Sequence, residues 1–348
     1  MTSGPEFNST SRRGFLALCA AIPLALGACS GSPKAPASSP PVQQSTGFPL
    51  TVEHAYGSTV VERPFTKVLT VGGQDSESML ALGLSPVART GDNVSAWYGA
   101  ALRALGPDPM PQVVDNTPKP LLQAARDLRP QLIISVSQVL PRALYDSLSK
   151  IAPVVLAPKT LNVESWADVQ RFYGKVLGVE SAAEDVVRTT TDDLAQSVKD
   201  YPGIKGKSAV FVRASSAKGA DIQLYDKDSS PLRLLGEVGF VPDPSLERVL
   251  QHPGNDADPQ GKSVYVAQTE AKSLSADVIM LAVPYADYQN YKMTKDLTLF
   301  PKLGKGQVYV VTTDNAFGFE RTSSLAASWL GRNVVPELAK FAYLSTKA

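Results

Sequence analysis

Apolar residues along the chain fall into two kinds of short run, and the two kinds alternate. Continuous runs rich in β-branched residues are typical of buried parallel strands. Runs with helical spacing, opened by a capping residue and closed by glycine or proline, are typical of amphipathic helices. The predicted strands are 50–54, 59–61, 67–71, 86–88, 131–135, 153–156, 208–213, 276–281 and 307–312. The predicted helices between them are 77–82, capped by Asp75 or Ser76, and then 121–128, 140–151, 232–235 and 322–344, the last broken near Gly331 and Pro336.

Strands that alternate with helices predict a parallel sheet with helices packed on its faces. The alternation stops once, at two consecutive helical stretches, 165–177 and 181–201. The second is long, and its apolar positions are sparse, which is typical of a strut between domains. The pattern therefore predicts an α/β protein whose two halves share one plan and are separated by this strut.

The N-terminus has the pattern of an export and lipidation signal. Arg12 and Arg13 precede an apolar run, 15–28, that is too short to span a bilayer comfortably. The pair resembles a twin-arginine signal, and 26–29 (Leu-Gly-Ala-Cys) resembles a bacterial lipobox whose Cys29 becomes the lipidated N-terminus. We therefore expect a signal peptide over 1–28 and an exported protein anchored by lipid to the outer face of the bacterial cytoplasmic membrane.

The rest of the chain divides at changes in composition. Residues 29–47 are rich in Ser, Pro and Ala and cannot bury enough apolar surface to fold, so we expect a disordered tether. The following segments are expected to be an N-terminal α/β lobe over 48–164, linker helices over 165–203, and a C-terminal α/β lobe with a terminal helix over 204–348.

Charge and residue counts exclude several classes of function. The 34 basic residues nearly balance the 33 acidic ones, so the basic surplus usual in nucleic-acid binders is missing. Two histidines cannot build a His-rich metal site, and both cysteines lie near the N-terminus. The chain has no nucleophile elbow, phosphate-binding loop or HExxH motif. We therefore expect a protein that is not an enzyme and has no catalytic residues.

Several segments, in order along the chain, resemble the family of periplasmic binding proteins that serves iron–siderophore and cobalamin ABC importers. The opening strand, loop and helix of that family resemble KVLTVGGQDSESMLALGLSPVA, and its next helix and strand resemble LQAARDLRPQLIIS. Further similar segments are LSKIAPVV, SPLRLLGEVG and the strands at 276–281 and 307–311. The resemblance covers about residues 50–345.

The resemblance implies two α/β lobes with mostly parallel central sheets, joined by one long linker helix, with the ligand held between them. It implies a solute-binding lipoprotein that captures a ferric siderophore and delivers it to an ABC permease. Iron would enter only inside the siderophore, so no resident metal or cofactor is expected, and we expect a monomer. Heme or cobalamin binding, and a structural or interaction lipoprotein that keeps the fold, remain as alternatives.

Candidate ligand-binding residues lie where the loops of both lobes should face the cleft. Glycine lets the backbone approach a ligand, exposed aromatic rings suit stacking, and arginine suits bidentate contact with carboxylate, hydroxamate or catecholate groups. For each residue the alternative is a structural role, either in packing or in a salt bridge. The candidates are Gly73 and Gln74 in a strand-to-helix loop, Trp97 and Tyr98 on a loop, and Arg142, Arg213, Tyr225, Tyr285 and Arg321.

The family docks its permease through one acidic residue on each lobe. The first of these positions falls at Gln123, which is uncharged, and the second falls beside Glu270. Glu270 is therefore the acidic docking candidate, whereas Gln123 departs from the family pattern.

Overall fold

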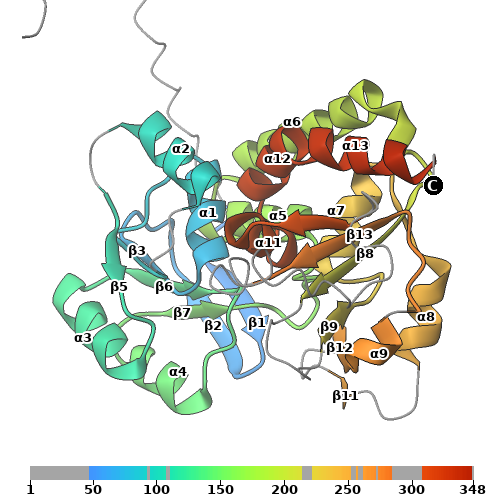
Figure 1. Ribbon diagram of the computed structural model, residues 1–348. Coiled ribbons are helices and arrows are strands. Elements are labelled where there is room, and N and C mark those ends of the chain that lie inside the picture. The colour runs from blue at the N-terminus through green and yellow to red at the C-terminus, as the bar shows by residue number, and fades with distance from the viewer. Residues whose placement is uncertain are drawn as a thin grey trace, which may run out of the picture. The chain divides into compact units, whose positions relative to one another are not determined.

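The computed structural model describes residues 47–91, 95–106, 110–213, 222–251, 256–257, 262–271, 273–283 and 308–346. These residues all belong to one compact unit that begins at Val42. They form two α/β lobes, each built around its own central sheet (Figure 1). The predicted fold class is confirmed.

The first lobe contains a five-stranded sheet in which every pairing is parallel. An antiparallel hairpin of β1 (Leu50–His54) and β2 (Gly57–Val61) lies beside it. The strands, in spatial order, are β5 (Gln112–Val114), β4 (Ala88–Thr90), β3 (Val68–Thr70), β6 (Leu132–Ser135) and β7 (Val154–Leu156). The helices are α1 (Gly73–Ala81), α2 (Ala96–Leu105), α3 (Pro118–Leu128) and α4 (Arg142–Leu148).

Both faces of this sheet are buried, which explains why its strands are continuous apolar runs. Successive residues of a strand point to opposite faces. Leu69 and Ile133 belong to the core that includes α3 and α4, whereas Val68 and Ile134 belong to the core that includes α1 and the next helix, α5 (Trp166–Leu177).

Two helices, α5 and α6 (Glu180–Asp200), carry the chain from one lobe to the other and pack along each other. They belong to the cores of both lobes. Ala183 of α6 packs in the core of the first lobe, and Val187 and Leu194 pack in that of the second. The linker helix is therefore a packed part of both lobes, and the short helix η1 (Pro202–Ile204) ends it.

The second lobe has a mixed sheet. β8, β10, β13 and β14 pair in parallel, whereas β9, β11 and β12 extend the sheet antiparallel from β8. These strands are β8 (Ser208–Arg213), β9 (Ile222–Tyr225), β10 (Val241–Pro242), β11 (Asp256–Ala257), β12 (Ser263–Val266), β13 (Val278–Ala282) and β14 (Val308–Val311). The helices are α7 (Ser230–Glu237), α8 (Pro244–Leu250), α9 (Gln268–Ala271), α11 (Thr313–Glu320), α12 (Ser324–Asn333) and α13 (Val335–Ser345).

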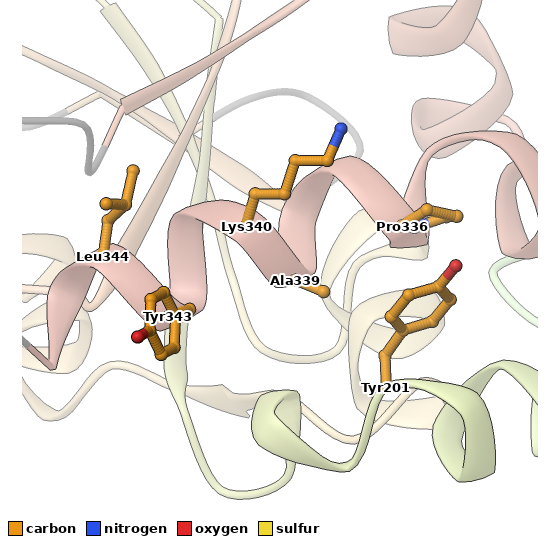
Figure 2. A pocket seen from close by; sticks show the side chains of 6 residues that line it. All are labelled: Tyr201, Pro336, Ala339, Lys340, Tyr343 and Leu344. Atoms are coloured by element: carbon orange, nitrogen blue, oxygen red, sulfur yellow. The ribbon is translucent and has the colours of Figure 1, made fainter.

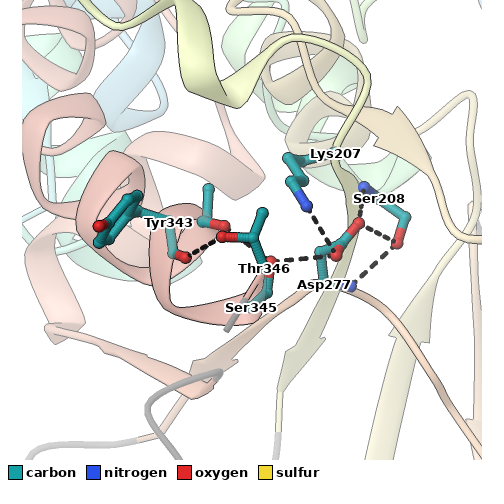
Figure 3. A network of polar contacts seen from close by, with 7 residues as sticks. Lys207, Ser208, Asp277, Tyr343, Ser345 and Thr346 are labelled. Carbon is teal, nitrogen blue, oxygen red and sulfur yellow. Dashed lines mark hydrogen bonds and ion pairs between the residues drawn. The ribbon is translucent and has the colours of Figure 1, made fainter. Parts of the chain in front are cut away.

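The C-terminal helices complete the contact between the lobes. The predicted break in the terminal helix occurs at Val334, between α12 and α13. Helix α12 packs on α6 and also reaches back to α1 and α2 of the first lobe (Figure 1). The end of α13 is held by Asp277, whose carboxylate accepts hydrogen bonds from Ser345 Oγ (3.0 Å), Lys207 Nζ (3.3 Å) and the Ser208 backbone N–H (2.9 Å), as Figure 3 shows.

One predicted helix start is wrong. Asp75 and Ser76 do not cap α1, which begins earlier, at Gly73. The side chain of Asp75 instead accepts hydrogen bonds from the backbone N–H groups of Val136 (2.9 Å) and Ser137 (3.2 Å) in the loop after β6. A bond to a neighbouring loop thus replaces the local cap, and it leaves the first turn of α1 facing the second lobe.

Gly72 makes this turn possible. Its φ of +129° lies in a region that side-chain-bearing residues rarely adopt, and a Cβ there would collide with Ser137 Oγ and Asp75 Oδ2. Gly83 also has a positive φ (+74°), but nothing lies within 4 Å of its Cβ position.

We therefore expect Gly72→Ala to lower the free energy of unfolding by about 3 kcal/mol, since backbone strain and overpacking add together. The control Gly83→Ala has the strain without the collision and should lose only about 1 kcal/mol. Urea denaturation of both variants measures the difference. Equal losses of unfolding free energy in the two variants would show that the close approach of Ser137 and Asp75 to Gly72 does not restrict this position.

Candidate functional site

Two hollows among the described residues are large enough for a small ligand. The first, of about 620 Å³, is an open hollow on α13 (Figure 2). It is lined by Tyr201, Pro336, Ala339, Lys340, Tyr343 and Leu344. Of these residues, only Lys340 carries a charge, and Figure 2 shows its amine pointing away from the tyrosine rings. Polar groups do not converge in this hollow, so its chemistry is that of an apolar surface depression.

The second hollow is a cavity of about 370 Å³ between the two lobes. Clefts of this size with a few converging polar groups are the usual form of small-ligand sites. The first lobe contributes Gly73, Gln74, Glu77, Arg89, Gly91, Ser95, Trp97 and Asn116. The second lobe contributes Asp314, Phe317 and Arg321. We refer to it as the inter-lobe cavity.

The topology of the first sheet accounts for its half of the inter-lobe cavity. Ligands of open α/β sheets bind outside the carboxyl ends of the strands. Gly73 follows β3, Gly91 follows β4, and Asn116 follows β5. Parallel strands bring these three loops to one edge of the sheet.

Helix α11 supplies the half from the second lobe. Asp314, Phe317 and Arg321 lie three and four residues apart, so they share one face of the helix and its end. Gly318, the residue after Phe317, faces Trp97. A Cβ atom at position 318 would lie only 2.8 Å from the indole ring. A side chain at position 318 would therefore push the lobes apart.

Asp75 fixes the helix that lines the cavity. Besides the two backbone bonds described above, it accepts hydrogen bonds from the hydroxyl groups of Ser137 and Tyr173. Burial raises the pKa of Asp75 to about 6, although these hydrogen bonds act in the opposite direction. The carboxylate thus ties α1 to α5 and to the loop after β6.

Glu77 lies one helical turn beyond Gly73 and joins three elements of the cavity wall. Its carboxylate accepts hydrogen bonds from Trp97 Nε1 (2.7 Å), Ser95 Oγ (3.4 Å) and the hydroxyl of Ser323, which belongs to the second lobe. Burial raises the pKa of Glu77 to about 7, against the effect of these bonds and of the charge on Arg89. This group therefore titrates near neutral pH inside the cavity.

Seven of the eleven cavity residues were not predicted from the sequence, and Arg89 is one of the charged residues among them. It is the middle residue of β4, is 3% exposed, donates a hydrogen bond to the Gly91 carbonyl and lies over the Tyr98 ring at 4.6 Å. An arginine in a short strand between Ala88 and Thr90 was the available signal, since a buried charge needs a partner or a ligand.

Comparisons with known proteins agree with this architecture. The model of a family described as periplasmic binding protein matches residues 69–243, half of the chain. The chain belongs to the periplasmic binding protein family.

Individual relatives are distant. YhfQ of Bacillus subtilis (strain 168), whose assignment as an ABC transporter substrate-binding lipoprotein is itself provisional, is 25% identical over 70% of this chain and 73% of its own length. PiaA from Streptococcus pneumoniae TIGR4, solved in complex with ferrichrome, is 20% identical with a TM-score of 0.70 over 84% of this chain and 99% of its own. A periplasmic solute binding protein from Mycobacterium smegmatis is 22% identical with a TM-score of 0.66 over 84% and 98%. The likenesses to solved structures show the fold.

In this periplasmic binding protein, four of the nine predicted ligand-binding residues meet in the inter-lobe cavity. They are Gly73, Gln74, Trp97 and Arg321. Gln74 also donates a hydrogen bond from Nε2 to the Thr322 carbonyl (2.6 Å) and so links the lobes. Their roles toward a ligand stay predictions.

The expected loop at Trp97 and Tyr98 is wrong. Ser95 Oγ accepts a hydrogen bond from the Tyr98 backbone N–H (3.3 Å) and caps α2, so both aromatic residues lie in its first turn. Trp97 is 5% and Tyr98 2% exposed, because both pack against α1 and α12. Trp97 still lines the cavity, whereas Tyr98 supports Arg89.

Three further candidates do not line the inter-lobe cavity. Arg142 is exposed at the start of α4 and pairs with Asp146 (2.8 Å). Arg213 forms a bidentate ion pair with Glu320, with its Nε 2.6 Å from the carboxylate. Its guanidinium thus has the salt-bridge role that was the alternative to ligand binding. Tyr225, the third of these candidates, lies nearby, and burial raises the pKa of its phenol. Tyr285 lies outside the described residues.

The predicted permease-docking residues lie on helices of different lobes. Gln123 is exposed on α3, where its Nε2 donates to Asp127 Oδ1 (2.9 Å), and Glu270 is half-buried on α9. Arg12, Arg13 and Cys29 lie outside the described residues. Within the described part of the chain, no helix could cross a membrane and no group of three potential metal ligands occurs.

The raised pKa of Glu77 predicts a pH dependence of stability. An acid whose pKa is higher in the folded state than in the unfolded state destabilises the fold as the pH rises from the unfolded value, 4.5, toward the folded one, about 7. We expect the free energy of unfolding of the wild type to fall, relative to Glu77→Gln, by about 2–3 kcal/mol between about pH 5 and about pH 8.

Urea denaturation at both pH values measures this double difference. Glu184→Gln, which alters an exposed ion pair with Arg171, is the control and should follow the wild type. Parallel pH profiles for the wild type and Glu77→Gln would contradict the assignment.

Proposed function

We propose that this protein is the substrate-binding lipoprotein of an ABC importer and that it captures a ferric siderophore in the inter-lobe cavity. The observation that supports this most directly is the cavity itself, which collects two arginines, two carboxylic acids and two aromatic side chains from both lobes. Arginine forks suit the anionic oxygens of iron chelates, and aromatic faces suit their apolar parts.

The relatives support the same class of ligand. The matched PiaA structure contains ferrichrome, and another protein of this fold, SirA from Staphylococcus aureus, was solved with staphyloferrin B. A siderophore surrounds its iron, so the cavity needs no metal ligands of its own. Heme binding would call for an axial His, Met, Cys or Tyr ligand, and the described lining residues include none of these.

The N-terminal signals support the location that this function requires. Lipidation at Cys29 after twin-arginine export would hold the protein on the outer face of the membrane, with 30–47 as the tether. We propose that it meets its permease through α3 and α9, at Gln123 and Glu270, which lie on different lobes as docking at both lobes requires.

Fluorescence titration of the purified protein with ferric hydroxamate, catecholate and citrate chelates, together with heme and cobalamin, tests the proposal. We expect saturable quenching by one class of ferric chelate, reported by Trp97 in the cavity wall. If folded protein gives no saturable response to any ferric chelate, the siderophore assignment is wrong.

Arg321→Ala should weaken binding of that chelate about 10-fold to 100-fold, because a charge-assisted hydrogen bond contributes about 1.5–3 kcal/mol. Arg142→Ala is the matched control, since Arg142 is an exposed arginine outside the cavity. Its affinity should stay within about twofold of the wild type, the small effect usual for exposed charges. Equal losses in the two variants would exclude specific contact by Arg321.

A further inference from the structure

Glu77 occupies an unusual place for a carboxylic acid in a cavity proposed to receive anions. It lines the inter-lobe cavity together with Arg89. Its oxygens are held on three sides, by Trp97 and Ser95 at the start of α2 and by Ser323 of the second lobe. The side chain cannot turn away from an arriving ligand without breaking these bonds.

Few charged or titratable groups face Glu77. β4 contributes Arg89, α2 contributes Tyr98, and α11 contributes Asp314 and Arg321 across the cavity. The other packed helices offer neutral groups, Ser323 at the start of α12 and Gln170 on α5. On α1 itself, Asp75 is engaged with Tyr173 and the loop after β6. Arg89 is therefore the principal source of positive charge that stabilises the Glu77 carboxylate from within its own lobe.

An anionic ligand that pairs with Arg89 changes this balance. The ligand adds a negative charge beside Glu77. It also partly neutralises the positive charge of Arg89, which otherwise stabilises the Glu77 carboxylate. Both effects disfavour the ionised carboxylate. Burial has already raised the pKa of Glu77 to about 7, so a further rise crosses physiological pH.

We propose that Glu77 binds one proton from solvent when an anionic ligand pairs with Arg89 in the inter-lobe cavity, and that this uptake lets the protein select anionic ligands. The step converts the carboxylate to the neutral acid, and the proton comes from water or buffer. The acid can then donate to Ser323 Oγ or to a ligand oxygen. The inference rests on the proposed function only in taking the inter-lobe cavity as the ligand site.

The consequence is a pH dependence that differs between ligands. Above neutral pH the affinity for an anionic ligand should fall by about tenfold in total, because a rise of about one unit in the pKa on binding corresponds to a tenfold difference in affinity. The affinity for a neutral ligand should not depend on Glu77 in this way.

Two tryptophans allow an experiment that needs no siderophore. Trp97 Nε1 donates to Glu77 (2.7 Å), and Trp166 Nε1 donates in the same way to Glu237 (2.9 Å), an exposed residue of α7 whose pKa is also raised by partial desolvation of its carboxyl group. Glu237 does not line the inter-lobe cavity. The two indole N–H signals therefore report one glutamate in the cavity and one outside it.

The indole signals of the full chain are followed by NMR from about pH 5 to about pH 9, with and without iron-free citrate, at constant ionic strength. We expect the midpoint sensed by Trp97 to rise by about one pH unit with citrate, the effect of a nearby like charge. The midpoint sensed by Trp166 should stay in place. Glu77→Gln should abolish the Trp97 titration, whereas Glu237→Gln should abolish only that of Trp166.

A Trp97 midpoint that citrate leaves unmoved overturns the proposal, whether or not a ferric chelate binds. So does an equal shift of both signals, which would indicate a general effect of citrate. Calorimetry at about pH 8 in two buffers of different ionisation enthalpy gives a second reading. Uptake of roughly half a proton per citrate is expected, because a one-unit rise in pKa leaves Glu77 about half protonated with citrate and mostly ionised without it. A citrate-dependent shift without chelate binding would keep this inference and reject the siderophore assignment.

Discussion

Two carboxylates of α1, the buried Asp75 and the half-buried Glu77, impose the main constraint on the junction between the lobes. A polar group shielded from water must have hydrogen-bond partners, or its burial costs several kcal/mol. Asp75 finds its partners within the first lobe, in the loop after β6 and in α5. Glu77 finds one of its partners, Ser323, in the second lobe. The helix that lines the cavity is therefore held on one side by its own lobe and on the other side by the opposite one.

The same residues therefore line the cavity and join the two lobes. Gln74, Glu77 and Trp97 each line the cavity and also contact the second lobe, through Thr322, Ser323 and Gly318 respectively. The linker adds to the same effect, because α5 and α6 pack in the cores of both lobes. Any change in the distance between the lobes must therefore alter the walls of the cavity.

Sequence reasoning found most of the fold and part of the site. Four of the five strands of the first sheet and the polar linker helix emerged within a few residues, because they have strong periodic signals. The edge strand β5 was not predicted. The antiparallel strands of the second sheet, β9, β11 and β12, were missed because they are short and their pattern is weak. Of the three arginines chosen from the sequence, Arg321 lines the cavity, whereas Arg213 and Arg142 do not, and Arg89 was not chosen. Glu320 is 107 residues from Arg213, so the sequence does not reveal their ion pair. The pair of Arg142 with Asp146, four residues later in a predicted helix, could have been read from the spacing.

The sequence by itself determined the alternation of strands and helices, the position of the linker, and the N-terminal pattern of export and lipidation. These properties are local, since each depends on residues that are neighbours along the chain. Only the tertiary structure decided which side chains share the cavity. Glu77 and Arg321 are 244 residues apart, and they share the cavity because α11 of the second lobe lies across it from the loops at the carboxyl edge of the first sheet. The raised pKa of Glu77 also arises there, because burial depends on both lobes being in place.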